Sequence, residues 1–214
     1  MASDEFGSAL AHWLGEQSGE QVEIVDLHRI ATGNSRANWY VEVADGARYV
    51  TRIAQGGVFG TSSVDEFAFM AAAHALGCPV APVRWIERTG TVLGHPFFVM
   101  DFVAGVATGR DDRSMSPTLV HDFVRRLADL HATDWRSEID SDVTSADATH
   151  AQIERWHRVY RAEVDVPIPL LEEGAEWLHH RAPALERVAI VHGDPAPGNY
   201  VHDGERVLAF TDWE

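Results

Sequence analysis

The feature that most constrains this chain is a cluster of polar residues near its C-terminal end, in residues 191–199. The segment reads Val-His-Gly-Asp-Pro-Ala-Pro-Gly-Asn, and a further aspartate, Asp212, follows the apolar run 208–210. Its prolines and glycines are typical of a rigid loop rather than of a helix or a strand. Phosphoryl transfer uses these residue types in this order: a carboxylate for the proton of an attacking hydroxyl, then an amide oxygen and a second carboxylate for Mg²⁺.

A β-hairpin is predicted between the two halves of this cluster. Residues 199–202 and 206–211 have strand character, and Asp203-Gly204 between them is a strong two-residue turn signal. Such a hairpin brings Asp212 back toward Asn199. The returning strand extends a few residues past Asn199, so the strands must twist or bend for the two residues to meet. The simpler interpretation is that His192 and Asp194 cap a turn and Asp212 ends a strand. Three polar groups at this spacing, each beside an apolar run, favour the catalytic interpretation.

The motif resembles a known signature. An Asp, an Asn a few residues later and a second Asp after two short strands are the pattern of protein kinases. More narrowly, residues 191–199 resemble the Brenner-type motif of the aminoglycoside phosphotransferase and choline kinase superfamily. The ending 212–214, Asp-Trp-Glu, and the layout upstream resemble phosphotransferase domains that accompany acyl-CoA dehydrogenases. The resemblance extends over nearly the whole chain.

The resemblance implies an α+β, two-lobed protein-kinase-like fold. Residues 1–105 are expected to form an antiparallel-sheet, nucleotide-binding N-terminal lobe, and residues 106–214 a mostly helical, catalytic C-terminal lobe. In the family the chain continues with further helices past the position of Glu214, so this lobe is expected to be incomplete, and association through its exposed surface is expected.

The resemblance also implies roles for the motif residues. Asp194 would orient or deprotonate the acceptor hydroxyl, and Asn199 and Asp212 would hold Mg²⁺. His192 is expected to brace the catalytic loop by hydrogen bonding. The cofactors implied are ATP and Mg²⁺, and the partner is a small molecule with a hydroxyl group.

In the N-terminal half, the implied nucleotide-binding residues are weaker signals. Arg52 stands on a predicted strand where the kinase pattern has a lysine; it keeps the charge but offers a planar fork. Glu66, in the first turn of a predicted helix, would pair with it, and Asp65 is the competing candidate. The alternatives are a solvated strand arginine and a glutamate that only caps its helix.

Two further contacts with nucleotide are implied by position alone. Gly33 lies in a turn of small residues whose backbone N–H groups could cradle phosphate oxygens, although a plain hairpin turn is an alternative. The adenine is expected to contact backbone in the hinge near Met100 to Phe102.

Composition narrows the classes of partner. Seventeen basic residues against thirty-three acidic residues give a net charge of −16, which disfavours nucleic acids and anionic membranes. No apolar run approaches the ~20 residues of a membrane span, and no secretory signal is recognisable at the N-terminus. A single cysteine, Cys78, is typical of a reducing compartment. We therefore expect a cytoplasmic protein.

Apolar periodicity predicts the remaining elements. Helices are expected at 6–15, 62–76, 118–131, 151–161 and 169–181, and strands at 22–27, 40–43, 48–54, 84–87 and 96–102. Residues 136–149 are expected to form a polar loop.

The function favoured by the sequence is ATP-dependent transfer of a phosphoryl group to a small-molecule hydroxyl. Two other classes stay open. One is an inactive nucleotide-binding pseudoenzyme that acts as a partner module. The other is a metal-dependent hydrolase built on His192 and Asp194, for which no further ligand cluster is evident.

Overall fold

A computed structural model describes residues 3–30, 36–54, 63–107, 115–139, 141, 143–145, 147–183 and 185–213. The helices are α1 (Ser3–Ser18), α2 (Ser63–Ala75), α3 (Pro117–Ala132), α4 (Ala148–Glu163) and α5 (Pro169–Arg181), with a 3₁₀ turn, η1, at Trp135–Ser137. The strands are β1 (Ile24–Ile30), β2 (Arg36–Val43), β3 (Arg48–Ala54), β4 (Val83–Glu87), β5 (Phe97–Asp101), β6 (Val106–Ala107), β7 (Tyr200–His202) and β8 (Val207–Phe210).

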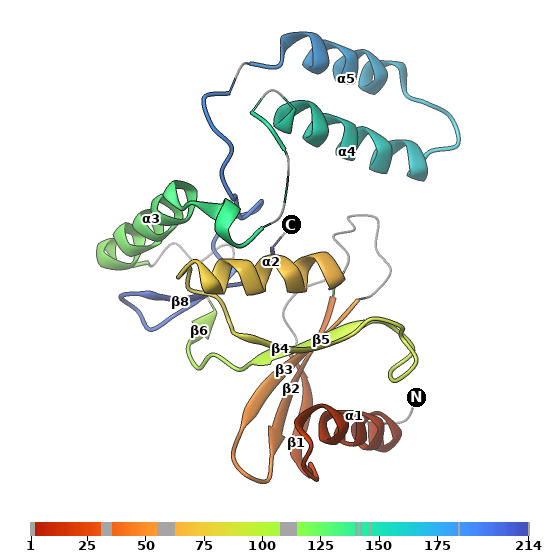
Figure 1. Cartoon of the computed structure of the whole chain (residues 1–214), viewed down its shortest axis with the longest axis vertical. Coiled ribbons are helices and arrows are strands. Elements are labelled where there is room, and N and C mark those ends of the chain that lie inside the picture. Colours follow the sequence, from red (N-terminus) through yellow and green to blue (C-terminus); the bar gives the residue numbers. More distant parts are fainter. Residues whose placement is uncertain are drawn as a thin grey trace.

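The N-terminal half is built around a five-stranded antiparallel sheet with the order β1-β2-β3-β5-β4. Helix α1 covers one face of this sheet and α2 covers the other (Figure 1). Side chains alternate between the two faces along β5, as strand geometry requires. Phe97 and Val99 pack with the apolar residues of α1, whereas Phe98 and Met100 pack in the cluster that contains Met70 of α2.

The second sheet is small and carries the C-terminal motif. Its order is β6-β7-β8, and α3 packs against it. The N-cap of α3 explains where that helix begins: Ser116 Oγ accepts the N–H of Leu119 at 3.1 Å, and Pro117 occupies the first turn. The same hydroxyl donates to the carbonyl oxygen of Gly204 at 2.9 Å, so the helix start also holds the turn between β7 and β8.

A buried carboxylate ties α3 to β8. Asp122 accepts hydrogen bonds from the backbone N–H of Val207 at 2.9 Å and from Arg125 at 2.6 Å, and Arg126 lies at 3.4 Å. Burial alone would raise the pKa of Asp122, but these hydrogen bonds and the two arginine charges together hold its pKa below the usual value.

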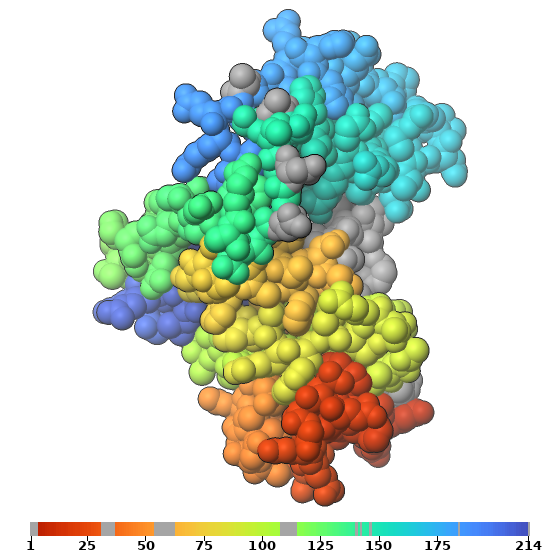
Figure 2. All heavy atoms as spheres, viewed as in Figure 1, coloured from red at the N-terminus to blue at the C-terminus, as the bar shows by residue number. Residues whose placement is uncertain are grey.

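Helices α4 and α5 pack on each other at the end of the molecule opposite α1 (Figure 2). Neither contains a buried residue. Polar pairs join them: His150 Nδ1 lies 2.9 Å from His179 Nδ1, and Glu172 contacts both His157 at 3.2 Å and Arg161 at 3.1 Å.

Most predicted elements are present, but some bounds differ: β2 begins at Arg36 rather than at residue 40, and α4 begins at Ala148, inside the expected loop 136–149. The short strand β6 and the turn η1 were not predicted, since two or three residues carry no periodicity. The hairpin turn is also longer than expected, because residues 203–206 separate β7 from β8. Asp203 Oδ1 accepts the N–H groups of Glu205 and Arg206, which fixes this turn. No helix among the described residues is long and apolar enough to cross a membrane.

Candidate active site

The loop before β7 joins the predicted catalytic residue Asp194 directly to Asn199, which is predicted to hold a metal. Asn199 Nδ2 donates to the Asp194 carboxylate at 3.0 Å and to the Asp194 carbonyl oxygen at 2.9 Å. The loop is closed by two backbone bonds, from Ala196 N–H to Asp194 and from Asn199 N–H to Ala196. Because Nδ2 points at Asp194, the amide oxygen of Asn199 is directed away from it.

The hairpin brings Asp212 to the same place. Thr211 donates its backbone N–H to the carbonyl oxygen of Asn199 at 2.9 Å, so the next residue, Asp212, lies beside Asn199. Asp212 has φ 64° and is the one non-glycine residue with positive φ in the described part of the chain. Asp and Asn tolerate this conformation best, and such strain, on the order of 1–3 kcal/mol, is concentrated at functional sites.

Arg52, on β3 of the five-stranded sheet, connects that sheet to Asp212. Its Nε lies 2.8 Å from Glu66 Oε1, and its Nη2 lies 2.6 Å from Asp212 Oδ1. The partner on α2 is therefore Glu66 and not the exposed Asp65. Arg52 and Glu66 are almost fully buried, with side-chain exposures of 6% and 1%. A third contact joins Nη1 to Asn38 Oδ1 at 3.4 Å, from the position directly opposite Arg52 on β2. The solvated-arginine interpretation is wrong, because this side chain is buried among carboxylates.

His192 is buried beneath the catalytic loop. Its ring lies 4.7 Å from the ring of Trp213 and 5.5 Å from that of Phe210, measured between centroids. Burial lowers the pKa of His192, and this outweighs the Thr211 backbone and the charges of Asp212 and Asp194, which act in the opposite direction. Both ring nitrogens of His192 are buried without a hydrogen-bond partner among the described residues, so the expected hydrogen-bonded brace is not seen and the ring is held by packing on Phe210 and Trp213.

The predicted hinge differs in detail from what the sequence indicated. Met100 is buried in β5, and the backbone N–H groups of the next two residues are already used. Asp101 donates to Pro82 at 2.9 Å, and Phe102 donates to Arg48 at 3.0 Å. The N–H groups of Asp101 and Phe102 are therefore not free to donate to the adenine that is expected here from the sequence.

One expected contact, the turn at Gly33 that could cradle phosphate oxygens, lies outside the described residues.

Sequence reasoning missed two contacts of this site. Asn38 was not considered, although it faces Arg52, because its position depends on the register of β2 with β3. Trp213 was noted only as part of the C-terminal ending. An aromatic residue directly after Asp212, the aspartate predicted to hold a metal, was the available signal for its packing on His192.

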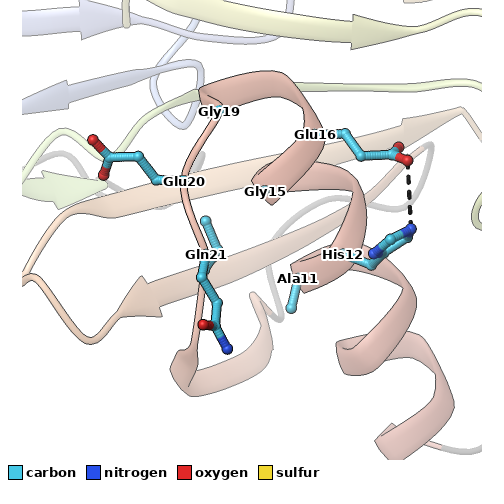
Figure 3. A pocket seen from close by; sticks show the side chains of 8 residues that line it. Ala11, His12, Gly15, Glu16, Gly19, Glu20 and Gln21 are labelled. Atoms are coloured by element: carbon cyan, nitrogen blue, oxygen red, sulfur yellow. Dashed lines mark ion pairs between the residues drawn. The ribbon is translucent and has the colours of Figure 1, made fainter.

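A surface hollow of about 520 Å³ lies elsewhere, at the C-terminal end of α1. In Figure 3 it is bordered by the last turns of α1 and by the segment that leads to β1. Its polar residues include His12 and Glu16, which lie 3.4 Å apart. None of the residues of the catalytic cluster line it, and it is not part of the candidate site.

The donor chemistry of the cluster fits Mg²⁺. This ion takes oxygen ligands, and it is commonly held by one or two protein groups together with substrate phosphates. Asp212 offers a carboxylate and Asn199 an amide oxygen, and the backbone bond from Thr211 to Asn199 brings the two segments together. Within the described ranges there is no group of three or more His, Cys, Asp or Glu residues that could hold a metal by itself, so the hydrolase interpretation gains no support.

The fold is that of the protein-kinase-like α+β class, with an antiparallel-sheet N-terminal lobe. The sequence profile described as "Phosphotransferase enzyme family" matches residues 26–214. The chain belongs to this family.

The chain is similar in sequence to part of several larger proteins. It is 26% identical to acyl-CoA dehydrogenase family member 10 of Mus musculus over 100% of this chain and 21% of the relative. Over 70% of this chain it is 31% identical to family member 11 of Mus musculus, covering 20% of that protein. The chain thus spans about a fifth of the length of these relatives.

Solved structures show the same fold. A crystal structure described as a candidate aminoglycoside phosphotransferase from Ralstonia eutropha superposes with a TM-score of 0.71 at 25% identity, over 96% of this chain and 64% of that chain. The aminoglycoside phosphotransferase APH(4)-Ia, in a ternary complex with ADP and hygromycin B, gives 0.68 at 17% identity, over 96% and 70%. The predicted family and fold class are confirmed.

Proposed function

We propose that this chain is a Mg²⁺-dependent phosphotransferase that moves the γ-phosphoryl group of ATP to a hydroxyl group of a small molecule. The observation that supports this best is the position of Asn199 between the two aspartates. Its side chain is bonded to Asp194, and its carbonyl oxygen is bonded to the residue before Asp212. These bonds connect the proposed base with the two residues proposed to bind the cation.

The proposed reaction follows from these positions. The acceptor hydroxyl oxygen bonds to the γ-phosphorus as the bond from that phosphorus to the bridging oxygen breaks, and ADP leaves. Asp194 orients the hydroxyl and accepts its proton. Asn199 and Asp212 would hold Mg²⁺, which neutralises phosphate charge that a protein of net charge −16 would otherwise repel.

The acceptor is proposed only as a class. APH(4)-Ia was crystallised with hygromycin B and nucleotides, which supports a small hydroxyl compound beside a nucleotide in this fold. The likeness to the acyl-CoA dehydrogenase family members makes hydroxyacyl compounds the first acceptors to test, and the acidic composition would also tolerate a cationic acceptor. We further propose residues 105 and 106 as the boundary between the lobes.

The test is calorimetric titration of Mg-ATP into the chain, followed by ADP release with a panel of acceptors. We expect micromolar to millimolar binding that requires Mg²⁺ and is lost in Asp212→Asn. Asp194→Asn should bind nucleotide but transfer about 10²–10⁴-fold more slowly, the usual contribution of a general base. Asp203→Asn, in the exposed hairpin turn, is the matched control.

Other outcomes identify the alternatives. Binding without transfer to any acceptor would indicate a pseudoenzyme, and ATP cleavage at full rate without acceptor would indicate a hydrolase. No Mg²⁺-dependent binding by the folded chain would contradict the proposal.

A further inference from the structure

The interface between α4 and α5 contains a pair of histidines that the proposed reaction does not use. His150 and Glu154 are four residues apart on α4, so their side chains share one face of that helix. Both contact the ring of His179 on α5. His150 Nδ1 lies 2.9 Å from His179 Nδ1, and Glu154 Oε1 lies 3.0 Å from His179 Nε2. The ring of His179 is therefore approached at both of its nitrogens by residues of α4.

The two imidazole rings meet edge to edge. Their planes are inclined by only 9°, and their centroids are 5.2 Å apart. This separation exceeds the Nδ1–Nδ1 distance of 2.9 Å by the radii of two imidazole rings, so both Nδ1 atoms lie on the line between the rings. The rings are thus not stacked face to face, and the two Nδ1 atoms point directly at each other.

The carboxylate of Glu154 assigns the protons of this pair. His179 Nε2 is shielded from solvent and has no aligned hydrogen bond among the described residues, but a carboxylate oxygen lies 3.0 Å away. A carboxylate is only an acceptor, and it would repel a lone pair on Nε2, so Nε2 carries the proton of His179. Nδ1 of His179 then presents its lone pair, and Nδ1 of His150 donates the hydrogen bond between the rings.

A single proton shift turns this pair into two metal ligands. His150 is exposed, so water can carry its proton from Nδ1 to Nε2 while the ring stays neutral. Two lone pairs then converge from different helices, and neutral imidazole is the commonest metal ligand in proteins. Zn–N bonds of about 2.0–2.1 Å at a tetrahedral angle put the two nitrogens roughly 3.3 Å apart. The rings have to tilt and to separate from 2.9 Å by about 0.4 Å to reach this geometry.

We propose that His150 and His179 form a binding site for a divalent transition-metal ion, represented by Zn²⁺, and that the bound ion holds α4 against α5. Water completes the coordination, since the described residues form no cluster of three ligands. Imidazole nitrogen suits Zn²⁺, Ni²⁺ and Cu²⁺, whereas Mg²⁺ takes oxygen ligands. The site is therefore chemically distinct from the one proposed at Asp212 and Asn199, and the inference goes beyond the proposed function without depending on it.

Two features of the helix pair support this site. A carboxylate beside the second nitrogen of a metal-bound histidine fixes its tautomer and raises its basicity, and Glu154 has this position relative to His179. Neither α4 nor α5 contributes a buried residue. A metal bridge would thus add a cross-link where apolar packing is weak.

The experiment is calorimetric titration of ZnCl₂ into the chain in millimolar Mg²⁺, which keeps oxygen sites occupied. Wild type is compared with His150→Ala, which removes one ligand at an exposed position. We expect wild type to bind one Zn²⁺ that the variant binds at least about tenfold more weakly, because even residues that only orient metal ligands contribute 10–100-fold. Hydrogen exchange of the α4 and α5 amides should slow with Zn²⁺ in wild type and not in the variant.

The matched control is His180→Ala. His180 is the next residue of α5, is 77% exposed and has its own carboxylate neighbour, Glu176, at 3.9 Å. This variant should keep the Zn²⁺ affinity of wild type.

A second readout does not depend on a variant. In ¹⁵N spectra of the histidine rings of wild type, His179 should be protonated at Nε2 and His150 at Nδ1. Zn²⁺ should shift the Nδ1 signals of both rings together. If His150→Ala does not fold, this spectrum decides, and unchanged Nδ1 signals in Zn²⁺ would reject the site.

Two calorimetric results would also overturn the inference. Equal Zn²⁺ affinity in wild type and His150→Ala would show that the metal binds elsewhere. An equal loss in His180→Ala and His150→Ala would show diffuse binding to surface histidines instead of a site at this pair.

Discussion

Phe210 donates its backbone N–H to the carbonyl oxygen of Pro79 at 2.7 Å, and Val80 forms a parallel bridge with the same residue. This bond joins the turn after α2 to the end of β8, two residues before Asp212. The helix that carries Glu66 and the strand that carries Asp212 are thus connected through backbone as well as through Arg52. We expect the positions of these two carboxylates to change together.

The thiol next to this bond should be inert in the native protein. Burial raises the pKa of Cys78 to about 12 from an ordinary value of 9.0, which reduces the reactive thiolate by on the order of a thousandfold. Labelling with a disulfide reagent at pH 8 should be at least a hundredfold slower in buffer than in urea, on the order set by the thiolate fraction. Equal rates would contradict the structure at this turn.

Loss of the Asp122 carboxylate should loosen the hairpin. Asp122→Ala leaves the Val207 N–H without its acceptor, so we expect a loss of about 1–3 kcal/mol in the free energy of unfolding at pH 7. The pKa of Asp122 is lowered in the folded state, so its contribution is present above the usual carboxyl pKa and is lost as the pH falls through the folded value. Urea denaturation of wild type and Asp122→Ala at pH 7 and pH 3 measures this contribution. If the variant loses as much unfolding free energy at pH 3 as at pH 7, the charge of Asp122 does not carry the effect.

Gly105 and Gly174 should respond in opposite ways to alanine. A Cβ at Gly105 would lie 2.5 Å from Val201 Cγ1 and 2.9 Å from the carbonyl oxygen of His202, so β6 and β7 would have to separate. We expect Gly105→Ala to destabilise the fold by about 1–3 kcal/mol.

At Gly174, within α5, nothing lies within 4 Å of the added atom. Gly174→Ala should stabilise by about 0.5–1 kcal/mol through helix propensity alone. Thermal unfolding of both variants provides the comparison. A Gly105→Ala variant with the stability of wild type would contradict the close approach of Gly105 to β7.

His192 should make stability depend on pH. Burial lowers the pKa of His192 in the folded state. As the pH falls, His192 is therefore protonated at a higher pH in the unfolded chain than in the folded protein. The folded state therefore loses stability as the pH decreases below the unfolded value of about 6.5. His192→Gln should show a smaller loss between pH 7 and pH 5.5 than wild type in denaturant titrations. The chain has twelve histidines, and all of them can contribute to the pH dependence. The relevant quantity is therefore the difference between wild type and His192→Gln in how steeply the free energy of unfolding changes with pH.

Local patterns predicted the elements of this fold well, because amphipathic helices and the residues around an Asp-Gly turn carry their own signals. The family resemblance also brought Asp194, Asn199 and Asp212 together, and the structure joins them through a short hairpin. The contact between Arg52 and Glu66 followed from the resemblance and not from spacing.

Contacts between distant segments could not be predicted. Asp122 and Val207 are 85 residues apart, and nothing local to an amphipathic helix indicates that one of its acids will cap a strand. Asn38 lies opposite Arg52 because of the register between β2 and β3. That register cannot be read from the sequence alone. Likewise, hydrogen bonds that use up the N–H groups of Asp101 and Phe102 have no side-chain signature.

The polar pairing of α4 with α5 has a consequence for how such a chain can change. Since neither helix contributes a buried residue, most substitutions there should cost little folding free energy, as is usual for surface positions. Mutations in this pair can therefore accumulate without endangering the sheet or the catalytic loop. For directed evolution, α4 and α5 are the positions where a library can be diversified most heavily while the rest of the molecule stays intact.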